Sequence, residues 1–457
     1  MEQLNQTTKR SSFTGKIGFV LAAAGSAVGL GNIWRFPYLA AKYGGGIFLL
    51  VYVILAVTFG FALMMAEIAI GRKTGKSAIE AFAALDKRFT FVGWLTAIVP
   101  CIILPYYSVI GGWVMKYIFG FASGDGINMA TDTYFGEYIS NAGEPVLWFM
   151  LFILVTAVVV FFGVEKGIEK VSKIMMPILI VFILFIVIYT LCTMPGAMDG
   201  VLYYIKPDFS KFSIMTVVAA LGQLFYSMSL AMGIMITFGS YMKKDISIEA
   251  SIHQIEIFDT GVAFLSGLMI VPAVFAFSGG DEEALSKGAS LMFVTLPKIF
   301  ETMPGGDIIG ALFFIMVFVA AITSSISLME TIVSIVMDKA KLSRRISCII
   351  VFGGVILLGL PSSLGYSIWS DITLLGFQFL DFFDFISNSI IMPVIALITC
   401  IFVGYFIKPK TIIEEANVEN KRFTKRLFTV VIRYVAPVCI VAILVSSILD
   451  AVGVFKI

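Results

Sequence analysis

The chain has 457 residues, of which 59% are hydrophobic and 14% charged, and its mean hydropathy is +0.99. A soluble domain of this length needs a polar surface that this composition cannot supply, so the bilayer must be the solvent for much of the chain. The five cysteines lie in or beside apolar segments, which argues against a disulfide framework. The single histidine, His253, has no Cys/His cluster around it, which argues against a structural zinc site.

Apolar runs long enough to cross about 30 Å of hydrocarbon, which takes about 20 helical residues, follow a polar segment at 1–16. That segment does not have the pattern of a cleavable signal. We predict eleven spans, at 17–38, 47–71, 89–121, 146–164, 170–194, 215–241, 249–278, 305–337, 345–362, 374–407 and 427–451. The chain is therefore predicted to be an all-α polytopic membrane protein.

Lysine and arginine residues in the connecting segments set the predicted orientation. With the N-terminus in the cytoplasm, the inner segments hold 23 Lys and Arg residues and the outer segments hold 6. The opposite orientation would invert this bias. We therefore expect a multi-pass protein of the cell (inner or plasma) membrane whose N-terminus is cytoplasmic and whose C-terminus is extracellular.

Two spans contain helix-breaking sequences. Span 1 holds Gly25-Ser26-Ala27-Val28-Gly29-Leu30-Gly31-Asn32, and each interior glycine costs a helix about 1 kcal/mol. A close helix–helix contact through small residues would also explain the glycines. Span 6 places Ser227, Ser229 and Gly233 at mid-span, five helices later. Paired broken spans indicate a transporter site between inverted repeats, because free N–H groups at a helix break bind anions and free carbonyls bind cations.

Polar side chains inside the other spans are candidates for function because they are costly in lipid. Thr323 and Ser324 in span 8 could bind a small cation, although on this span alone hydrogen bonds back to their own helix are the more common arrangement. Asp259 in span 7 could neutralise a cation or titrate. Glu67 in span 2 could accept hydrogen bonds from the freed N–H groups of a broken helix, while His253 is interpreted as a surface residue at the inner mouth of span 7.

Together these residues resemble the neurotransmitter:sodium symporter family. The resemblance rests on Gly25 to Pro37 (GSAVGLGNIWRFP), Gly44-Gly45-Gly46, Glu67, the span 6 sequences GQLFYSMSLAMG and SYMKKD, and AAITSSISLME in span 8. It covers the chain from Arg10 to span 11. Eleven spans and short loops are typical of the bacterial amino-acid transporter branch.

The resemblance implies a LeuT-type fold in which 17–194 and 215–407 form two inverted five-helix repeats, with 427–451 as an additional peripheral helix. It also implies Na⁺-coupled uptake of amino acids or amines, with two Na⁺ sites. The first Na⁺ site would use Ala27, Asn32, Ser227 and Asp259. The second would use Gly25, Val28, Ala320, Thr323 and Ser324.

The same resemblance implies a substrate site and two gates. The substrate would contact Ala27, Gly29, Leu30, Gly31, Ile103, Tyr107, Tyr226, Ser227, Ser229, Met232, Ser327 and Leu328. Arg35 and Asp384 would form the outer ion pair, with Tyr107 and Tyr226 as an aromatic lid. Arg10 and Asp338 would form the inner pair.

Two departures from the family pattern bear on mechanism. Phe13 stands where the inner gate usually has a tryptophan. Asp259 stands where chloride-dependent members have a neutral side chain, while Tyr52, Gln223 and Ser227 match positions around their chloride. Because a fixed carboxylate can supply the charge that chloride supplies elsewhere, we expect no chloride requirement, and we hypothesise that Asp259 returns a proton.

The pocket residues also bear on the substrate. No acid occupies the position of Gly29, which argues against amines without a carboxylate, and the lining is apolar or hydroxylic, which favours neutral side chains. Met232 is adaptable and suggests hydrophobic, including aromatic, side chains. The expected partners are a small-molecule amino acid and the lipid bilayer, with no nucleic acid and at most a weak oligomer.

Three other classes of protein fit less well. A channel needs a continuous pore with rings of charge or filter loops, which this chain lacks. An intramembrane enzyme needs a nucleophile–base pair or a metal cluster, and neither is present. A transport-inactive amino-acid sensor on the same fold is compatible with the sequence.

Overall fold

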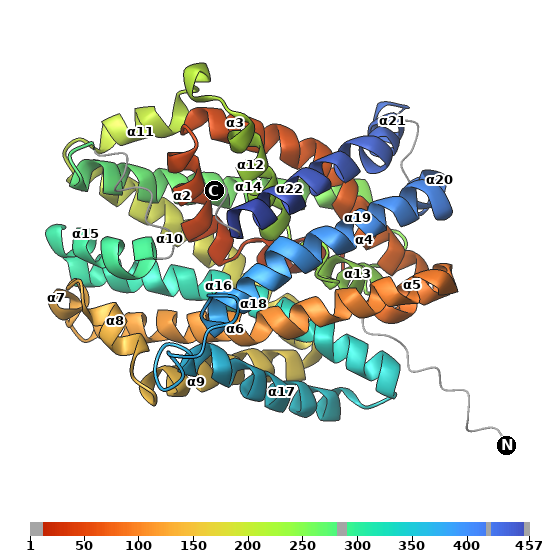
Figure 1. The fold of residues 1–457 in the computed structure, drawn as a ribbon, viewed down its shortest axis with the longest axis horizontal. Coiled ribbons are helices and arrows are strands. Elements are labelled where there is room, and N and C mark those ends of the chain that lie inside the picture. The colour runs from red at the N-terminus through yellow and green to blue at the C-terminus, as the bar shows by residue number, and fades with distance from the viewer. Residues whose placement is uncertain (1–11, 281–289, 417–421, 452–457) are drawn as a thin grey trace.

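The computed structural model describes residues 12–280, 290–416 and 422–451. Those residues form helices and connecting segments, and the helices run mostly along the long axis of the molecule (Figure 1). Because the bilayer cannot hydrogen-bond to backbone groups, helices that satisfy their own N–H and C=O groups are what the apolar composition requires.

The helices of the first half begin with a broken pair and end with the short helix α11. Their bounds are α1 Lys16–Ala27, η1 Gly31–Arg35, α2 Phe36–Lys42, α3 Gly46–Leu55, η2 Ala56–Gly60, α4 Phe61–Thr74, α5 Ala78–Leu85, η3 Lys87–Phe89, α6 Thr90–Ala122, α7 Gly126–Met129, α8 Tyr134–Ile139, α9 Glu144–Phe161, η4 Val164–Glu169, α10 Lys170–Thr193 and α11 Ala197–Ile205. The elements η1, η2 and η4 are π-helical turns, which continue the helices beside them.

The second half repeats a broken helix at its start. Its elements are η5 Phe209–Lys211, α12 Ile214–Ser227, α13 Ile234–Ser240, α14 Ile248–Phe277, η7 Leu291–Thr295, α15 Leu296–Thr302, α16 Gly306–Ala340, α17 Arg344–Leu364, α18 Phe379–Asp384, η8 Phe385–Ile391, α19 Met392–Ile401, η9 Phe402–Phe406, α20 Pro409–Glu415, α21 Arg422–Val430, η10 Val431–Val435 and α22 Ala436–Ala451.

Nine helices within the described residues are long and apolar enough to cross a membrane, and the bent pair α1 and η1–α2 makes a tenth. Each lies within a few residues of a predicted span. The remaining prediction, 215–241, corresponds to α12 and α13, which are separated by residues 228–233 and are each too short to cross the membrane alone. The count of eleven spans therefore stays a prediction.

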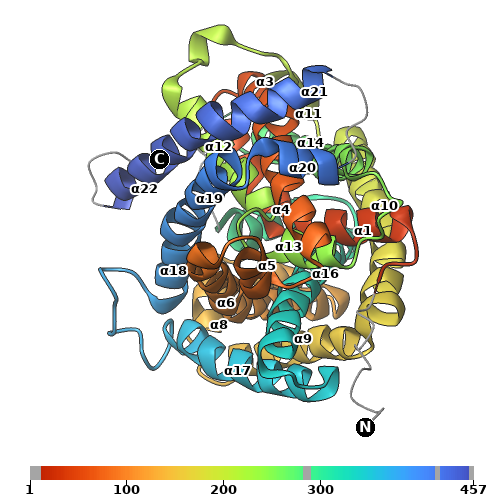
Figure 2. The ribbon, with the colours of Figure 1, turned by 90° about the vertical axis from the view of Figure 1, so that its right-hand side faces the viewer.

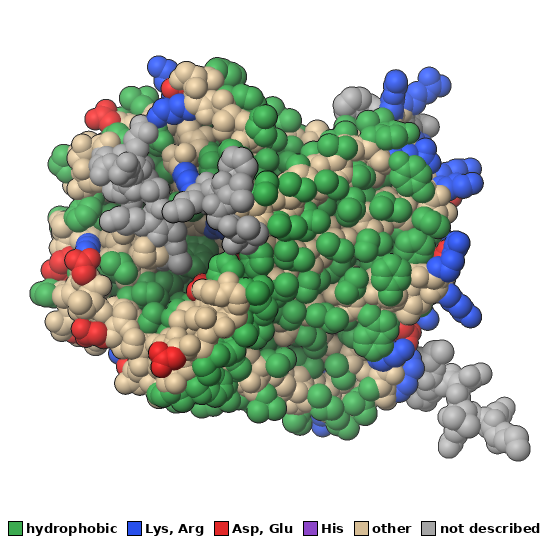
Figure 3. All heavy atoms as spheres, in the orientation of Figure 1, with side chains coloured by type: hydrophobic (Ala, Val, Ile, Leu, Met, Phe, Trp, Pro, Cys, Tyr) green, Lys and Arg blue, Asp and Glu red, His purple; other side chains and the backbone are tan. Residues whose placement is uncertain are grey.

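The broken helices lie inside the bundle. Figure 2 looks along the bundle from the right-hand end of Figure 1, and α1 and α13 lie among α4, α14 and α16 there. The outer surface is apolar: Figure 3 shows hydrophobic side chains over the middle of the molecule and most Lys and Arg side chains at its right-hand end. This is the surface expected of a protein whose sides contact lipid.

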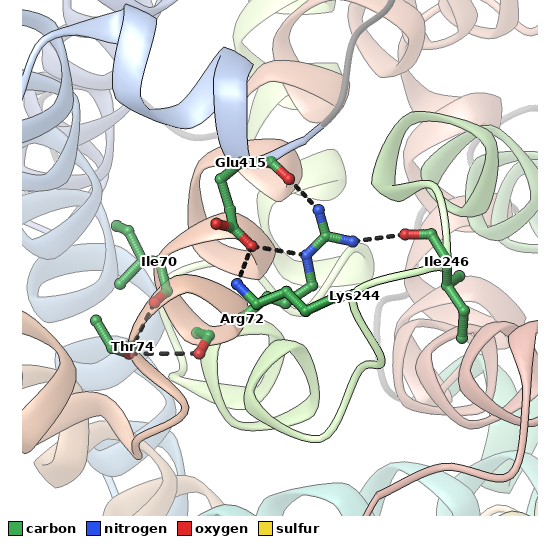
Figure 4. Close-up of polar contacts among 7 residues, drawn as sticks. Ile70, Arg72, Thr74, Lys244, Ile246 and Glu415 are labelled. Atoms are coloured by element: carbon green, nitrogen blue, oxygen red, sulfur yellow. Dashed lines mark hydrogen bonds and ion pairs between the residues drawn. The ribbon is translucent and has the colours of Figure 1, made fainter.

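A buried ion pair ties three segments at the basic end of the molecule (Figure 4). Arg72 at the end of α4 donates from Nε to Glu415 Oε1 at 2.9 Å and from Nη1 to the carbonyl of Ile246 at 2.5 Å. Lys244 donates to the same Glu415 oxygen at 2.6 Å. Only 1% of the Arg72 side chain and 10% of the Glu415 side chain are exposed, so solvent screens the pair weakly.

This geometry predicts that Glu415→Gln destabilises the protein, because it leaves the Arg72 charge buried without a carboxylate. We expect a loss of about 1.5–3 kcal/mol, measured as a lower apparent melting temperature in detergent. Glu414→Gln is the matched control, because 63% of the Glu414 side chain is exposed and its pair with Lys410 spans 3.6 Å. Exposed pairs contribute about 0–1 kcal/mol, so equal melting temperatures for the two variants would contradict the role given to Glu415.

Candidate functional site

The first helix break lies between α1 and η1, near the middle of the bent pair. The chain bends by 57° here, and Val28 and Gly29 are not helical. The side chain of Asn32 accepts from the N–H of Gly29 at 3.2 Å, and Gln223 of α12 donates to the carbonyl of Gly31 at 2.9 Å. The glycine-rich sequence therefore forms a break whose backbone groups face polar partners, as predicted, rather than a continuous helix.

The second break, at 228–233 between α12 and α13, faces the first. Ser229, Ala231 and Gly233 have positive φ values of 52°, 59° and 75°, a conformation that costs a residue with a side chain and usually marks a functional constraint. Glu67 of α4 accepts from the N–H of Ala231 at 2.7 Å, which confirms the contact predicted between Glu67 and a broken helix. Ser229 donates to the carbonyl of Ser26 at 3.0 Å and so joins the two breaks.

A small cavity of about 30 Å³ lies between the two breaks. Eleven of the twelve residues predicted to contact substrate line it: Ala27, Gly29, Leu30, Gly31, Ile103, Tyr107, Tyr226, Ser227, Ser229, Met232 and Leu328. Ser327 does not line it, and its hydroxyl donates to the carbonyl of Thr323 at 3.0 Å, within its own helix. Ser26 and Ile234 also line the cavity and were not predicted, although both lie within or beside the recognised breaks.

Two tyrosines, Tyr107 and Tyr226, are among the residues that line the cavity. The Tyr107 hydroxyl accepts from the N–H of Leu30 at 3.4 Å. The Tyr226 ring packs against Gly31 so closely that a Cβ on Gly31 would lie 2.5 Å from a ring atom. The glycine is therefore required by the close approach of the aromatic ring.

A buried carboxylate lies beside the cavity. Asp259 of α14 is 0% exposed, and its Oδ1 accepts from Asn32 and from Ser227, both at 2.7 Å. Its Oδ2 accepts from the Tyr52 hydroxyl at 3.2 Å. All three of these donors are neutral. A buried carboxylate in such surroundings favours a bound cation, and the oxygen atoms of Asn32 and Ser227 are suitable ligands for a small hard ion.

The five residues predicted for a second cation site meet between α1 and α16. The Ser324 hydroxyl lies 3.4 Å from the carbonyl oxygen of Gly25 and 3.3 Å from that of Val28. The Thr323 hydroxyl donates to the carbonyl of Ala320 at 3.1 Å. A Cβ on Gly25 would lie 3.3 Å from that of Thr323, so the two helices are in close contact here. Hydroxyl and carbonyl oxygens converge at this point without a carboxylate among the five.

Arg35 and Asp384, both within the described residues, do not form the direct ion pair that was predicted. The Arg35 guanidinium lies over the Tyr226 ring, 5.4 Å from its centroid. The Asp384 carboxylate instead accepts from Tyr106 at 3.1 Å and from Asn388 at 2.7 Å. Arg35 contacts Tyr226, while Asp384 is hydrogen-bonded to side chains of α6 and η8 instead of the arginine.

The inner gate is described only in part, because Arg10 lies outside the described residues. Asp338 accepts from the N–H of Ser77 at 2.9 Å. Phe13, which stands in place of the usual tryptophan, is fully buried, and its N–H donates to the carbonyl of Tyr241 at 3.2 Å. The Tyr241 hydroxyl donates to Glu330, which also receives two 2.7 Å hydrogen bonds from Arg344. His253 is half exposed and stacks on Phe61.

This combination of two facing helix breaks, a cavity between them and buried oxygen clusters defines a secondary transporter with a LeuT-type fold. Comparisons with known proteins agree with this class and fold. The sequence model of the sodium:neurotransmitter symporter family matches residues 10–125 and 128–454, so the chain belongs to that family. It is therefore a sodium-dependent membrane transporter and not an enzyme.

Individual relatives agree with this assignment. The chain is 35% identical over 452 residues to an uncharacterised sodium-dependent transporter of Bacillus subtilis, YhdH, covering 96% of this chain and 98% of the relative. It is 32% identical over 459 residues to an uncharacterised sodium-dependent transporter of Haemophilus influenzae, with the same coverage. Among solved structures, MhsT in complex with L-phenylalanine matches with a TM-score of 0.87 and 35% identity, covering 96% of this chain and 100% of MhsT.

Proposed function

We propose that this protein is a symporter that imports neutral amino acids with hydrophobic or aromatic side chains, together with Na⁺ and by alternating access. The observation that carries the proposal is the cavity between the two helix breaks. Its lining combines the backbone of the first break at Leu30 and Gly31 with apolar side chains from Ile103, Met232 and Leu328. The binding of L-phenylalanine by MhsT, a structural neighbour, supports this substrate class.

The proposed binding mode follows from the polarity of the breaks. The substrate carboxylate would meet the N–H groups at Leu30 and Gly31 and the Tyr107 hydroxyl, because a helix start is electropositive. The amino group would meet carbonyl oxygens at Ala27, Tyr226 and Ser227. The side chain would extend toward Ile103, Ser229, Met232 and Leu328.

Two Na⁺ ions are proposed to travel with the substrate. The first would bind among Ala27, Asn32, Ser227 and Asp259, with the substrate carboxylate as a further ligand. The second would bind among Gly25, Val28, Ala320, Thr323 and Ser324. Neutral oxygens in the second set suit a monovalent cation better than a divalent one, whose charge usually requires carboxylates.

The proposed topology places the N-terminus in the cytoplasm and the C-terminus outside the cell membrane, with 17–194 and 215–407 as inverted repeats. The gathering of Lys and Arg side chains at one end of the molecule in Figure 3 supports this orientation. Arg35 and Asp384 would close the outer side by approaching each other, and Arg10 and Asp338 would close the inner side. The protein would act as a monomer or weak oligomer.

The first prediction from this proposed function concerns transport itself. Purified protein in liposomes should accumulate labelled L-phenylalanine when an inward Na⁺ gradient is imposed, because Na⁺ and the substrate carboxylate stabilise each other in the first site. Replacing the Na⁺ gradient by K⁺ should reduce uptake to the level of protein-free liposomes. Binding of neutral amino acids without accumulation would instead indicate a sensor on the same fold.

A second prediction concerns chloride. Asp259 supplies a fixed negative charge beside the first Na⁺ site, so replacing chloride by gluconate on both sides of the membrane should leave the rate of Na⁺-driven uptake unchanged. Asp259→Asn should then abolish uptake in gluconate, because it leaves the cation site without that charge. A collapse of wild-type uptake in gluconate would rule out chloride independence.

A third prediction compares the contributions of the adjacent Ser324 and Ser325 hydroxyls to Na⁺ binding. Ser324→Ala should raise the Na⁺ concentration for half-maximal uptake by about tenfold, because about 1.4 kcal/mol of cation binding is lost with one ligand. Ser325→Ala is the control, since the Ser325 hydroxyl lies 3.0 Å from Thr156 and faces away from α1. An equal effect of both substitutions would show that the loss is structural rather than a loss of Na⁺ coordination.

A further inference from the structure

Basic side chains gather where α20 and α21 meet the inner end of the bundle. We call Lys408, Lys410, Arg422, Lys425 and Arg426 the α20–α21 basic face. Four of these residues are exposed and Lys425 is half buried. Figure 1 places both helices at the right-hand end of the molecule, where Figure 3 shows Lys and Arg side chains projecting.

The spacing on α21 puts its charges on one side of the helix. Arg422, Lys425 and Arg426 stand at positions i, i+3 and i+4, which lie on one helical face. Phe428 is fully buried and Leu427 packs partly against the core, so the apolar side faces the protein. Since the candidate span Thr424–Leu449 begins within α21, the basic residues lie at the membrane boundary.

The acids of the segment do not neutralise this face. The Glu415 carboxylate is paired with Arg72 and Lys244 instead (Figure 4). Glu414 lies 3.6 Å from Lys410 in an exposed pair. Among the described residues, Arg422, Lys425 and Arg426 have no ion pair within 4.0 Å. Within the described part of 408–430, five basic residues therefore stand against two acidic ones.

We propose that the α20–α21 basic face binds the headgroups of anionic phospholipids in the inner leaflet. A cluster of exposed Lys and Arg beside a membrane span matches the negative surface potential of that leaflet. The amphipathic arrangement holds the cations at headgroup depth. The ion pair between Arg72 and Glu415 fixes α20 from the protein side, and buried Phe428 packs α21 against the protein.

The test compares lipid association with the full-length protein, using spin-labelled phosphatidylglycerol and spin-labelled phosphatidylcholine as probes in phosphatidylcholine vesicles. We expect the wild-type protein to prefer phosphatidylglycerol, and we expect the preference to shrink as salt is added. One Lys or Arg near an anionic surface corresponds to roughly a fivefold change in association. The variant Lys410→Gln, Arg422→Gln, Lys425→Gln, Arg426→Gln should therefore lose at least about tenfold of the preference.

The matched control neutralises four exposed basic residues elsewhere near the predicted inner side, by Lys166→Gln, Lys170→Gln, Lys339→Gln and Arg345→Gln. It should retain most of the preference. Unchanged association of phosphatidylcholine and an unchanged gel-filtration profile would show that both variants are folded. An equal loss in both variants, or no preference in the wild-type protein, would overturn the proposal and leave these residues as determinants of topology only. Association is measured without transport, so this result is independent of the proposed substrate.

Discussion

The hydrogen bonds to the backbone groups that two broken helices release inside the membrane are the interactions on which the site depends. Each unpaired N–H or C=O group in an apolar interior costs about 1–3 kcal/mol, so the breaks persist only with fixed partners. Glu67 receives the N–H of Ala231, Gln223 donates to the carbonyl of Gly31, and Ser229 donates to that of Ser26. Ser26, Gly31 and Ser229, which take part in these hydrogen bonds, also line the cavity. The same hydrogen bonds therefore hold both breaks beside the space in which a substrate would bind.

Three buried acids show how charge is used differently in this protein. Glu330 receives two hydrogen bonds from Arg344, and Glu415 receives one from Arg72, so each has a permanent cationic partner. The three hydrogen-bond donors to Asp259 are the neutral Asn32, Ser227 and Tyr52. A permanent pair suits a structural contact between segments. A carboxylate with neutral donors beside a cavity suits an exchangeable cation, which is what a sodium-dependent transporter requires.

The sequence predicted the helical spans and both breaks well, because apolar length and clustered glycine or serine residues are local signals. Contacts across helices were harder. In span 8 the Thr323 hydroxyl donates to a carbonyl of its own helix, while the neighbouring Ser324 hydroxyl donates to a carbonyl of α1. Which of the two hydroxyls faces α1 depends on how α16 is rotated about its axis, and the sequence does not specify that rotation. The pair of Arg72 and Glu415 joins residues 343 positions apart and left no local pattern. Arg35 and Asp384 are in the expected region, but their actual partners, Tyr226, Tyr106 and Asn388, depend on side-chain packing that spacing cannot specify.

On the proposed assignment, coupling between ion and substrate follows from shared residues. Ala27 and Ser227 belong to both the substrate set and the first Na⁺ set, and Ser227 contacts Asp259 directly. Binding of either ligand would order the same residues at both breaks, so each would raise the affinity for the other by the same factor. The residues proposed for the second Na⁺ site contact α1 from α16, through the Ser324 hydroxyl. Loss of its ion would remove contacts that join α1 to α16, which would leave α1 freer to move when the inner side opens.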